Sequence, residues 1–228
     1  MKRNQSGFTL IEIAIVLVII GLLLGGVLKG QELINSAKVK NLATDFKNIP
    51  VYIYGYQDKF RALPGDDANP VSHVGATATV CTASATCKLG DGLIQGEWDS
   101  SNSTADESQL FWQQIRLANL AAGTTSGDML PTNAVGGIIG ITSLANFTDP
   151  SAAPKLNGTY VICSAGILGK YAKQLDIQMD DGSQIGGSMR EFSQAGGRGT
   201  ALAVPAGAYL DASGQINDNQ TFTVCMGV

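Results

Sequence analysis

The residue in the most unusual chemical setting of this 228-residue chain is Glu12. It is the only ionisable side chain in an apolar run of 21 residues, 8–28, of which 15 are Leu, Ile, Val or Phe. A carboxylate is costly inside a membrane and normally requires a partner of opposite charge, such as an ammonium group. Glu12 therefore indicates a specific charge pair rather than an ordinary surface position.

The other chemistry-bearing residues form no recognisable catalytic site, and we expect no catalytic residue. His73 is the only histidine, which removes most catalytic and metal-site architectures, and we expect it in an exposed loop. The chain has no Walker A, H-E-x-x-H or G-x-S-x-G motif. Its net charge of −4 argues against electrostatic capture of nucleic acid. The composition therefore disfavours both an enzyme and a nucleic-acid-binding protein.

Acidic residues offer one weak metal candidate. Calcium binds clusters of oxygen ligands, and Asp180 and Asp181, followed by Gly182, are the best candidates in the chain. No D-x-D-x-D-G spacing is present. We therefore expect the acidic stretches to be solvated turns and the protein to need no cofactor; the stretches are 66–67, 91, 99, 106–107 and 180–181.

Four cysteines, Cys81, Cys87, Cys163 and Cys225, allow three disulfide pairings. A zinc site built from all four is the alternative. The gap between Cys81 and Cys87 is wider than the usual zinc-ligand spacing of about two to four residues, and no C-x-x-C is present. The cysteines therefore favour disulfides in an oxidising compartment.

The element that must position Glu12 is a membrane helix. At about 1.5 Å per residue, 21 residues reach about 31 Å, close to the hydrocarbon thickness of a bilayer. The 15 large apolar side chains contribute about −4.5 to −9 kcal/mol to insertion, which exceeds the ~3 kcal/mol cost of one carboxylate. Lys2 and Arg3 precede the run and predict a cytoplasmic N-terminus. A secretory signal fits poorly, since the run is long and no A-x-A-like site follows it.

The helical pattern continues beyond the membrane. Apolar residues recur with alternating spacings of three and four, which predicts one stripe on a helix; they are Val39, Leu42, Phe46, Ile49, Ile53, Tyr56 and Phe60. We expect one helix over residues 8–60. Further helices are predicted from a capping box at Thr104 and Glu107 to Gly123, and over 165–180. Strands are predicted at 135–141, 159–163, 184–190, 201–204 and 221–226.

Gly7 and Phe8, followed by Thr9-Leu10-Ile11-Glu12 and the apolar run, resemble the prepilin cleavage and methylation motif of type IV pilins and of type II secretion pseudopilins. The resemblance implies that prepilin peptidase cleaves after Gly7 and that the new amine of Phe8 is N-methylated. It also implies that Glu12 serves assembly, by placing a negative charge near another subunit's N-terminal ammonium.

The resemblance also implies the architecture. We expect an α+β, pilin-like fold in which a long N-terminal helix packs on a disulfide-bonded head with an antiparallel sheet. The expected parts are a leader (1–7), a transmembrane and filament-core helix (8–28), its amphipathic continuation (29–60) and the head (61–228). Type IV pilins commonly bracket a C-terminal region with a disulfide, so we favour Cys163–Cys225, which joins two predicted strands, and Cys81–Cys87, which closes a small loop.

The implied function is that of a structural subunit of a type IV pilus-like filament. Its partners would be the peptidase and methylase, other pilin subunits and an inner-membrane assembly platform. The precursor would span the inner membrane with a periplasmic head, and the subunit would later join an extracellular pilus or a periplasmic pseudopilus. A minor pseudopilin of a type II secretion system remains an alternative. A membrane-anchored extracellular binding module is the alternative from another class.

Overall fold

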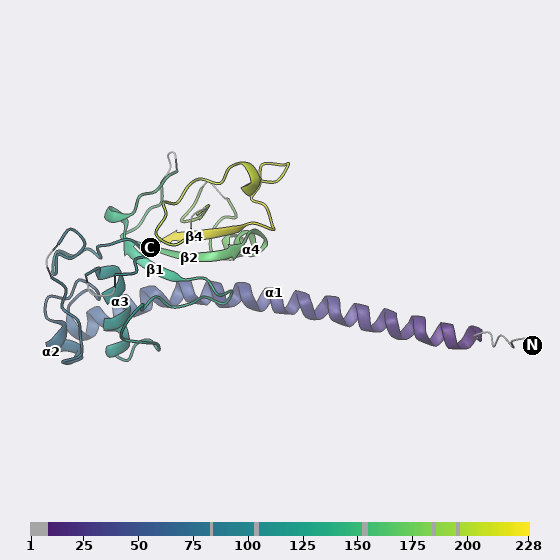
Figure 1. The fold of residues 1–228 in the computed structure, drawn as a ribbon, viewed down its shortest axis with the longest axis horizontal. Helices are drawn as coiled ribbons and strands as arrows, with labels where there is room; N and C mark the ends of the chain where they lie inside the picture. Colours follow the sequence, from purple (N-terminus) through teal and green to yellow (C-terminus); the bar gives the residue numbers. More distant parts are fainter. Residues whose placement is uncertain (1–8, 83, 103–104, 152–154, 184–185, 195–196) are drawn as a thin grey trace, which may run out of the picture. The chain divides into compact units, whose positions relative to one another are not determined.

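The computed structural model describes residues 9–82, 84–102, 105–151, 155–183, 186–194 and 197–228 (Figure 1). The chain divides into two compact units, residues 1–38 and 39–228, and the second is called the head from here on. The helices and strands, in chain order, are α1 (Leu10–Phe60), α2 (Pro70–Val74), α3 (Glu107–Leu117), β1 (Ile139–Ser143), β2 (Tyr160–Leu168), α4 (Gly169–Met179), β3 (Met189–Phe192) and β4 (Thr221–Gly227), with short 3-10 turns at Leu144–Asn146 and Gly207–Tyr209.

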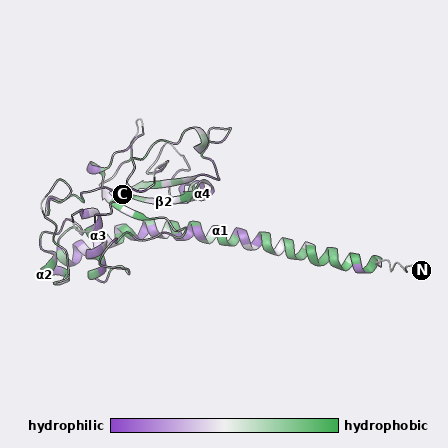
Figure 2. Ribbon diagram, viewed as in Figure 1, coloured by the Kyte–Doolittle hydropathy of each residue, from purple (hydrophilic) through white to green (hydrophobic). Residues whose placement is uncertain are grey.

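The N-terminal half of α1 is apolar on every side. Figure 2 shows an almost continuous hydrophobic stretch along this half, and its large side chains, from Leu10 to Leu28, are exposed. A helix that is hydrophobic all round needs lipid or other protein around it. Within the described residues, α1 is the one helix long and apolar enough to cross a membrane.

The C-terminal part of α1 contributes one stripe to the core of the head. Six of the seven residues predicted from the three-and-four spacing are buried, and Phe60 is half-buried. The helix continues through Pro50. The opposite side carries Val51 and Tyr54, which are exposed. The sequence periodicity therefore predicted which face of this helix is buried.

The sheet of the head is antiparallel, with strand order β1-β2-β4-β3 (Figure 1). Alternate residues of a strand face opposite sides, so the sheet separates two hydrophobic clusters. Ile162 of β2 belongs to the larger cluster, which also holds the buried stripe of α1. Val161 and Cys163 belong to the smaller cluster. The predicted α+β class, with a long N-terminal helix and an antiparallel sheet, is confirmed.

Several predicted boundaries are wrong for local reasons. Residues 165–168 continue β2 through an irregularity after Ser164, so α4 begins at Gly169. The first strand begins at Ile139 rather than at 135, because the carboxamide of Asn133 accepts bonds from the N–H groups of Val135 and Gly137 and closes a turn there.

The other differences concern helix and strand ends. α3 ends at Leu117 rather than at Gly123, since Asn119 adopts a left-handed conformation that stops the helix. β3 begins at Met189, and residues 184–185 of the predicted strand lie outside the described residues. The predicted strand at 201–204 has only an isolated bridge between Ser193 and Ala203.

Candidate functional site

The N-terminal motif contains a helix cap that the sequence analysis missed. Thr9 precedes the first residue of α1, and its N–H and its hydroxyl donate to the Oε2 atom of Glu12 at 2.8 and 2.7 Å. The N–H of Glu12 donates back to Oγ1 of Thr9 at 3.3 Å. This reciprocal pair is a capping box, and the T-x-x-E spacing at 9–12 is its signal. Gly7 and Phe8 lie outside the described residues.

The cap gives Glu12 a local partner. A carboxylate in an apolar segment must be satisfied by a hydrogen bond or a cation, and here two donors come from Thr9. The position near the helix N-terminus also suits a negative charge, because the helix dipole is positive there. The cap therefore satisfies this carboxylate at the start of the apolar half of α1.

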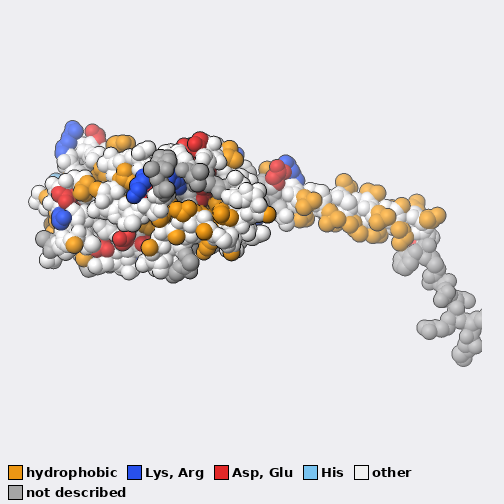
Figure 3. Space-filling model, turned by 90° about the horizontal axis from the view of Figure 1, so that it is seen from above, with side chains coloured by type: hydrophobic (Ala, Val, Ile, Leu, Met, Phe, Trp, Pro, Cys, Tyr) orange, Lys and Arg blue, Asp and Glu red, His pale blue; other side chains and the backbone are white. Residues whose placement is uncertain are grey.

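Small residues interrupt the apolar surface at regular spacing. A side chain added at Gly21, Gly25, Gly26 or Gly30 would meet no atom within 4 Å. The spacings 21/25 and 26/30 are those that let membrane helices approach closely. Figure 3 shows hydrophobic side chains covering this part of the helix. The surface around Glu12 is thus built to contact other apolar helices or lipid.

The sequence predicts that Thr104 and Glu107 form a capping box at the start of a helix. Thr104 lies outside the described residues, and Glu107 does not play the predicted part. α3 begins at Glu107, but the Glu107 carboxylate accepts from the backbone N–H groups of Lys88 (2.6 Å) and Gln95 (2.9 Å). Glu107 is fully buried. Its carboxylate therefore holds the loop of residues 88–95 instead of the end of its own helix.

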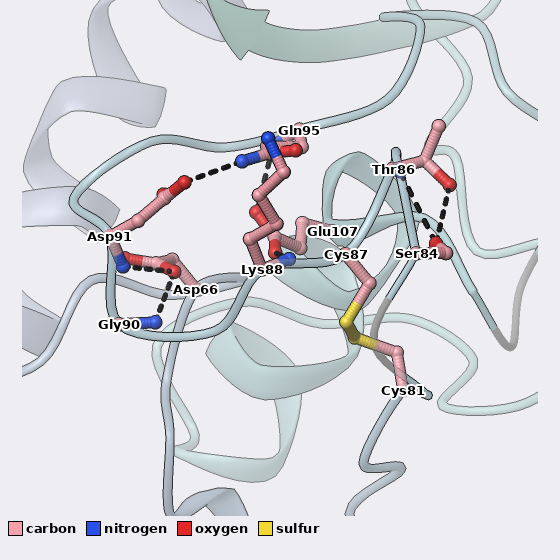
Figure 4. The surroundings of a disulfide bond; sticks show 10 residues. All are labelled: Asp66, Cys81, Ser84, Thr86, Cys87, Lys88, Gly90, Asp91, Gln95 and Glu107. Atoms are coloured by element: carbon pink, nitrogen blue, oxygen red, sulfur yellow. Dashed lines mark hydrogen bonds between the residues drawn. A yellow bond between two sulfur atoms is a disulfide. The ribbon is translucent and has the colours of Figure 1, made fainter.

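Asp66 holds the same loop from the other side. Its carboxylate accepts from the N–H groups of Gly90 (2.5 Å), Asp91 (3.2 Å) and Gly92 (2.7 Å). Figure 4 shows the side chains of Asp66 and Glu107 bonded to this loop, with the Cys81–Cys87 disulfide nearby. The prediction that the acidic stretches are solvated turns is wrong here, since Asp66, Asp67, Asp99, Asp106 and Glu107 are buried.

Burial changes the acidity of the Glu107 carboxyl group. Removal from water disfavours the charged form and raises the pKa of Glu107 to about 7, and the bonds from Gln95 and Lys88 oppose the rise. Burial likewise raises the pKa of Asp66. Neither carboxyl group has a basic partner among the described ion pairs. Both serve as acceptors for loop N–H groups, which is a structural role.

The disulfides form the pairs expected from the sequence and the resemblance. Cys163 and Cys225 lie directly opposite each other on β2 and β4, and Cys81 bonds to Cys87. The longer pairing closes a segment with a sequence separation of 62 and joins the two central strands. All four sulfur atoms are therefore engaged.

His73 lies in α2 and is half-buried, so the prediction of an exposed loop residue is wrong. Its Nδ1 atom lies 2.7 Å from Oδ2 of Asp67, which also accepts from the buried hydroxyl of Tyr56 at 2.7 Å. The imidazole stacks on the ring of Phe60, with centroids 5.3 Å apart. This network closes the end of α1 against the following loop.

The sequence-predicted calcium candidates lie at the C-terminal end of α4. Carboxylate oxygens of Asp176, Asp180 and Asp181 come within 4.8 Å of one another. Asp176, which the sequence analysis did not select, is buried, and burial together with the charge of Asp180 raises its pKa to about 7. The i, i+4 spacing of Asp176 and Asp180 was the available signal.

A cleft of about 540 Å³ lies between residues 97–101 and 198–202. Two of its charged side chains, Arg198 and Asp99, are bonded within the protein. Nε of Arg198 donates to the carbonyl of Asp99 at 2.7 Å, and its guanidinium pairs with Asp128. Asp99 accepts from the N–H of Gly199 at 2.7 Å. The cleft therefore gives no specific support to a ligand-binding function.

Comparison with known proteins supports the N-terminal motif. Residues 2–28 match the family model described as the prokaryotic N-terminal methylation motif. No curated protein and no solved structure matches the chain. The match covers the apolar half of α1 and ends before the head, so the head is interpreted from its own geometry.

Proposed function

We propose that this chain, which carries the N-terminal signature of type IV pilins and pseudopilins at residues 2–28, is the precursor of a structural filament subunit. The observation that carries the proposal is this motif at the start of α1, on an apolar run (residues 8–28) whose one carboxylate is Glu12. The motif belongs to structural proteins that prepilin peptidase processes and that assemble with other pilin subunits. A non-enzymatic role agrees with it.

The first proposed step is membrane insertion. The apolar part of α1 spans the inner membrane with Lys2 and Arg3 on the cytoplasmic side, and the head lies on the periplasmic side. The peptidase then cleaves between Gly7 and Phe8 and removes both basic residues, which takes the net charge from −4 to −6. The new amine of Phe8 becomes N-methylated. The subunit thereby gains a single cationic group at the start of its apolar helix.

The second step is assembly. Glu12 moves from its bonds with Thr9 to the terminal ammonium of a neighbouring subunit, which exchanges a local cap for an ion pair in an apolar filament core. Such a pair is strong where water is excluded. The pair sets the axial position of one subunit against the next, and the glycines at 21, 25, 26 and 30 admit close helix contacts.

Within this family we assign the chain to a pilus-like filament with an extracellular end state. The part of the chain after α1, residues 61–228, is large for a compact major pseudopilin, which favours a pilin or a minor subunit. A minor pseudopilin in a periplasmic pseudopilus is the second candidate, because the N-terminal motif is common to both.

N-terminal sequencing and intact mass of the protein, recovered from membranes and from sheared surface filaments, test the proposal. We expect a chain that starts at N-methyl-Phe8 in the sheared fraction. The same start found only in membranes would favour a pseudopilin. An uncleaved Met1 would refute the filament assignment and favour an anchored binding module, and cleavage after residue 28 would refute it and indicate a secretory signal.

Three substitutions sharpen this test. Gly7→Arg should block processing, whereas the matched Gly7→Ala should be processed in part, as read on an immunoblot. Glu12→Ala should be cleaved normally and yet be absent from sheared filaments. Normal incorporation of Glu12→Ala would contradict the proposed ion pair while leaving the cleavage assignment intact.

A further inference from the structure

The Cys81–Cys87 disulfide lies beside a buried carboxyl group. The two sulfur atoms and a carboxylate oxygen of Glu107 all lie within 4.8 Å of one another (Figure 4). Glu107 and Cys87 are 0% and 1% exposed, and Cys81 is 6% exposed. The N–H of Glu107 donates to the carbonyl of Thr86 at 3.4 Å, which ties the disulfide loop to the start of α3. An acidic group is therefore at hand wherever this disulfide takes up or releases a proton.

The two disulfides of the head differ in access. An open hollow of about 480 Å³ is lined by Cys81 and by residues 87–91, and it gives a small reagent an approach to this bond. Cys163 and Cys225 are both 0% exposed and lie opposite each other on the central strands β2 and β4. Thiol–disulfide exchange depends on access to the sulfur that is attacked. Cys81–Cys87 is therefore the bond that a reductant reaches first.

Opening a buried disulfide requires a proton. A thiolate that attacks one sulfur atom expels the other sulfur as a second thiolate. When the departing sulfur is buried, as that of Cys87 is, its charge is costly because it has lost its hydration. A proton donor beside the departing sulfur removes this cost, and Glu107 is in that position.

The surroundings of Glu107 allow its carboxyl group to exist with and without a proton. Burial is the main cause that raises the pKa of Glu107 to about 7, and the negative charges of Asp66 and Asp91, on the loops that face it, act in the same direction. The N–H groups of Lys88 (2.6 Å) and Gln95 (2.9 Å) donate to its two oxygens and favour the charged form. The same groups that hold the loop therefore also stabilise the carboxylate that remains after a proton has left.

We propose that Cys81–Cys87 is an exchangeable disulfide that a dithiol reduces, and that Glu107 supplies the proton to the departing sulfur. A thiolate of the dithiol attacks Sγ of Cys81, the more exposed of the two, and the bond between Cys81 and Cys87 breaks. Sγ of Cys87 leaves with the electron pair and takes the proton of the Glu107 carboxyl group, directly or through one water.

The second thiol of the reagent completes the reaction. As a thiolate, it attacks the reagent's own sulfur in the mixed disulfide, and Cys81 leaves and takes a proton from water. Two electrons have then passed from the dithiol, which becomes a disulfide, to the cysteine pair, and Glu107 regains its proton from solvent. Oxidation reverses the steps and opens or closes the ring of residues 81–87 according to the redox conditions around the head. This inference concerns the head and stands independently of the proposed filament function.

Reduction of the full-length chain in detergent micelles by dithiothreitol, a dithiol, tests the exchange. Samples taken over time are quenched, the free thiols are alkylated, and peptide masses show which cysteines have reacted. We expect Cys81 and Cys87 to become alkylated at least about tenfold faster than Cys163 and Cys225, because the rate depends on access. Equal rates for the two disulfides would overturn the proposal.

The pH profile tests the proton donor. Rates are compared from pH 6 to 8.5 at a fixed concentration of the dithiothreitol thiolate, so that titration of the reagent does not contribute. The wild-type rate for Cys81–Cys87 should fall at least about fivefold as the pH passes 7, because Glu107 loses its proton. Glu107→Gln has no acidic proton, so its profile should be flat, with a rate at pH 6 at least about tenfold below that of the wild type.

Two further variants separate proton transfer from loss of structure. Asp91→Asn keeps Glu107 and removes one negative charge that acts on it, so the midpoint of the fall should move to lower pH. Asp58→Asn removes an exposed carboxylate elsewhere in the head and should react like the wild type.

Three results would overturn the role of Glu107. A flat wild-type profile does so even if Glu107→Gln fails to fold. A midpoint that does not move in Asp91→Asn would mean that another group titrates. A change in the rate of Glu107→Gln that is equal at every pH, with the wild-type slope kept, would mean that Glu107 only holds the loop.

Discussion

Three carboxyl groups in the head are buried and have no basic partner among the described ion pairs; they are those of Glu107, Asp176 and Glu191. Loss of hydration is the main cause that raises the pKa of each to about 7. Glu107 differs from the other two because both of its oxygens accept bonds from backbone N–H groups. The effect of Glu107 on stability can therefore be tested as that of a carboxyl group with a structural role.

We expect the stability of the head to fall as the pH rises from 5 to 8. A carboxyl group whose pKa is higher in the folded state stabilises the fold fully below its unfolded pKa of 4.5, and this contribution is lost as the pH passes about 7. For Glu107 the loss is on the order of 2–3 kcal/mol. Urea unfolding of wild type and Glu107→Gln at pH 5, 6.5 and 8 measures it.

Asp176 and Glu191 change the free energy of unfolding with pH in the same direction in both proteins. The difference in pH dependence between wild type and Glu107→Gln therefore reports Glu107 alone. The free energy of unfolding of Glu107→Gln should change less over this range than that of the wild type. Asp58→Asn, which removes an exposed carboxylate, should keep the wild-type slope. Equal slopes for Glu107→Gln and wild type would show that Glu107 titrates normally.

The cap formed by Thr9 and Glu12 gives a second prediction. Thr9→Val removes the hydroxyl that bonds to Glu12 and keeps the size of the side chain, so the start of α1 should lose about 1 kcal/mol. In detergent micelles, the backbone amide of Glu12 should exchange its hydrogen about fivefold faster. Thr9→Ser keeps the hydroxyl and should exchange at the wild-type rate. Unchanged exchange in Thr9→Val would contradict the cap.

Among the elements, α1 changes character along its length. Up to about Leu28 it is apolar on all sides, whereas from Val39 it buries one stripe and exposes the other side. The first pattern suits lipid or a bundle of like helices, and the second suits packing on a domain of the same chain. One continuous helix thus combines a membrane or filament segment with a core segment of the head.

The disulfides tie elements together over very different chain lengths, which predicts unequal stabilisation. The chain-entropy relation gives about 4 kcal/mol for the Cys163–Cys225 bond, with a sequence separation of 62, and about 2 kcal/mol for Cys81–Cys87, with a separation of 6. The double variant Cys163→Ala/Cys225→Ala should therefore lower the free energy of unfolding by more than Cys81→Ala/Cys87→Ala. Urea midpoints compare the two, and the reverse order would refute the entropic argument for this protein.

On the scale of the whole molecule, the buried core belongs to one unit. Every buried residue in the described part of the chain lies at Val39 or beyond, and both disulfides lie in the head. A domain with its own hydrophobic core can fold alone. The apolar half of α1 is then dispensable for folding of the head.

A chain that begins at Asn35 tests this division. It retains one turn of α1 before Val39, and we expect a soluble monomer with the helix and strand content of the head and one cooperative unfolding transition. Circular dichroism and size-exclusion chromatography measure these properties. Aggregation, or loss of the transition under oxidising conditions, would mean that the head needs the N-terminal half of α1.

Short-range patterns in the sequence were sufficient to predict the N-terminal signature, the length and apolar surface of α1, and the buried stripe from Val39 to Tyr56. Each depends on spacing within one helix, which is a property of the local chain. The tertiary structure alone decided which acidic residues are buried. Glu107 meets the loop of residues 88–95, and Glu191 is buried in β3, a strand that contacts α4. No periodicity predicts such contacts, because the burial of a polar residue depends on how separate elements pack.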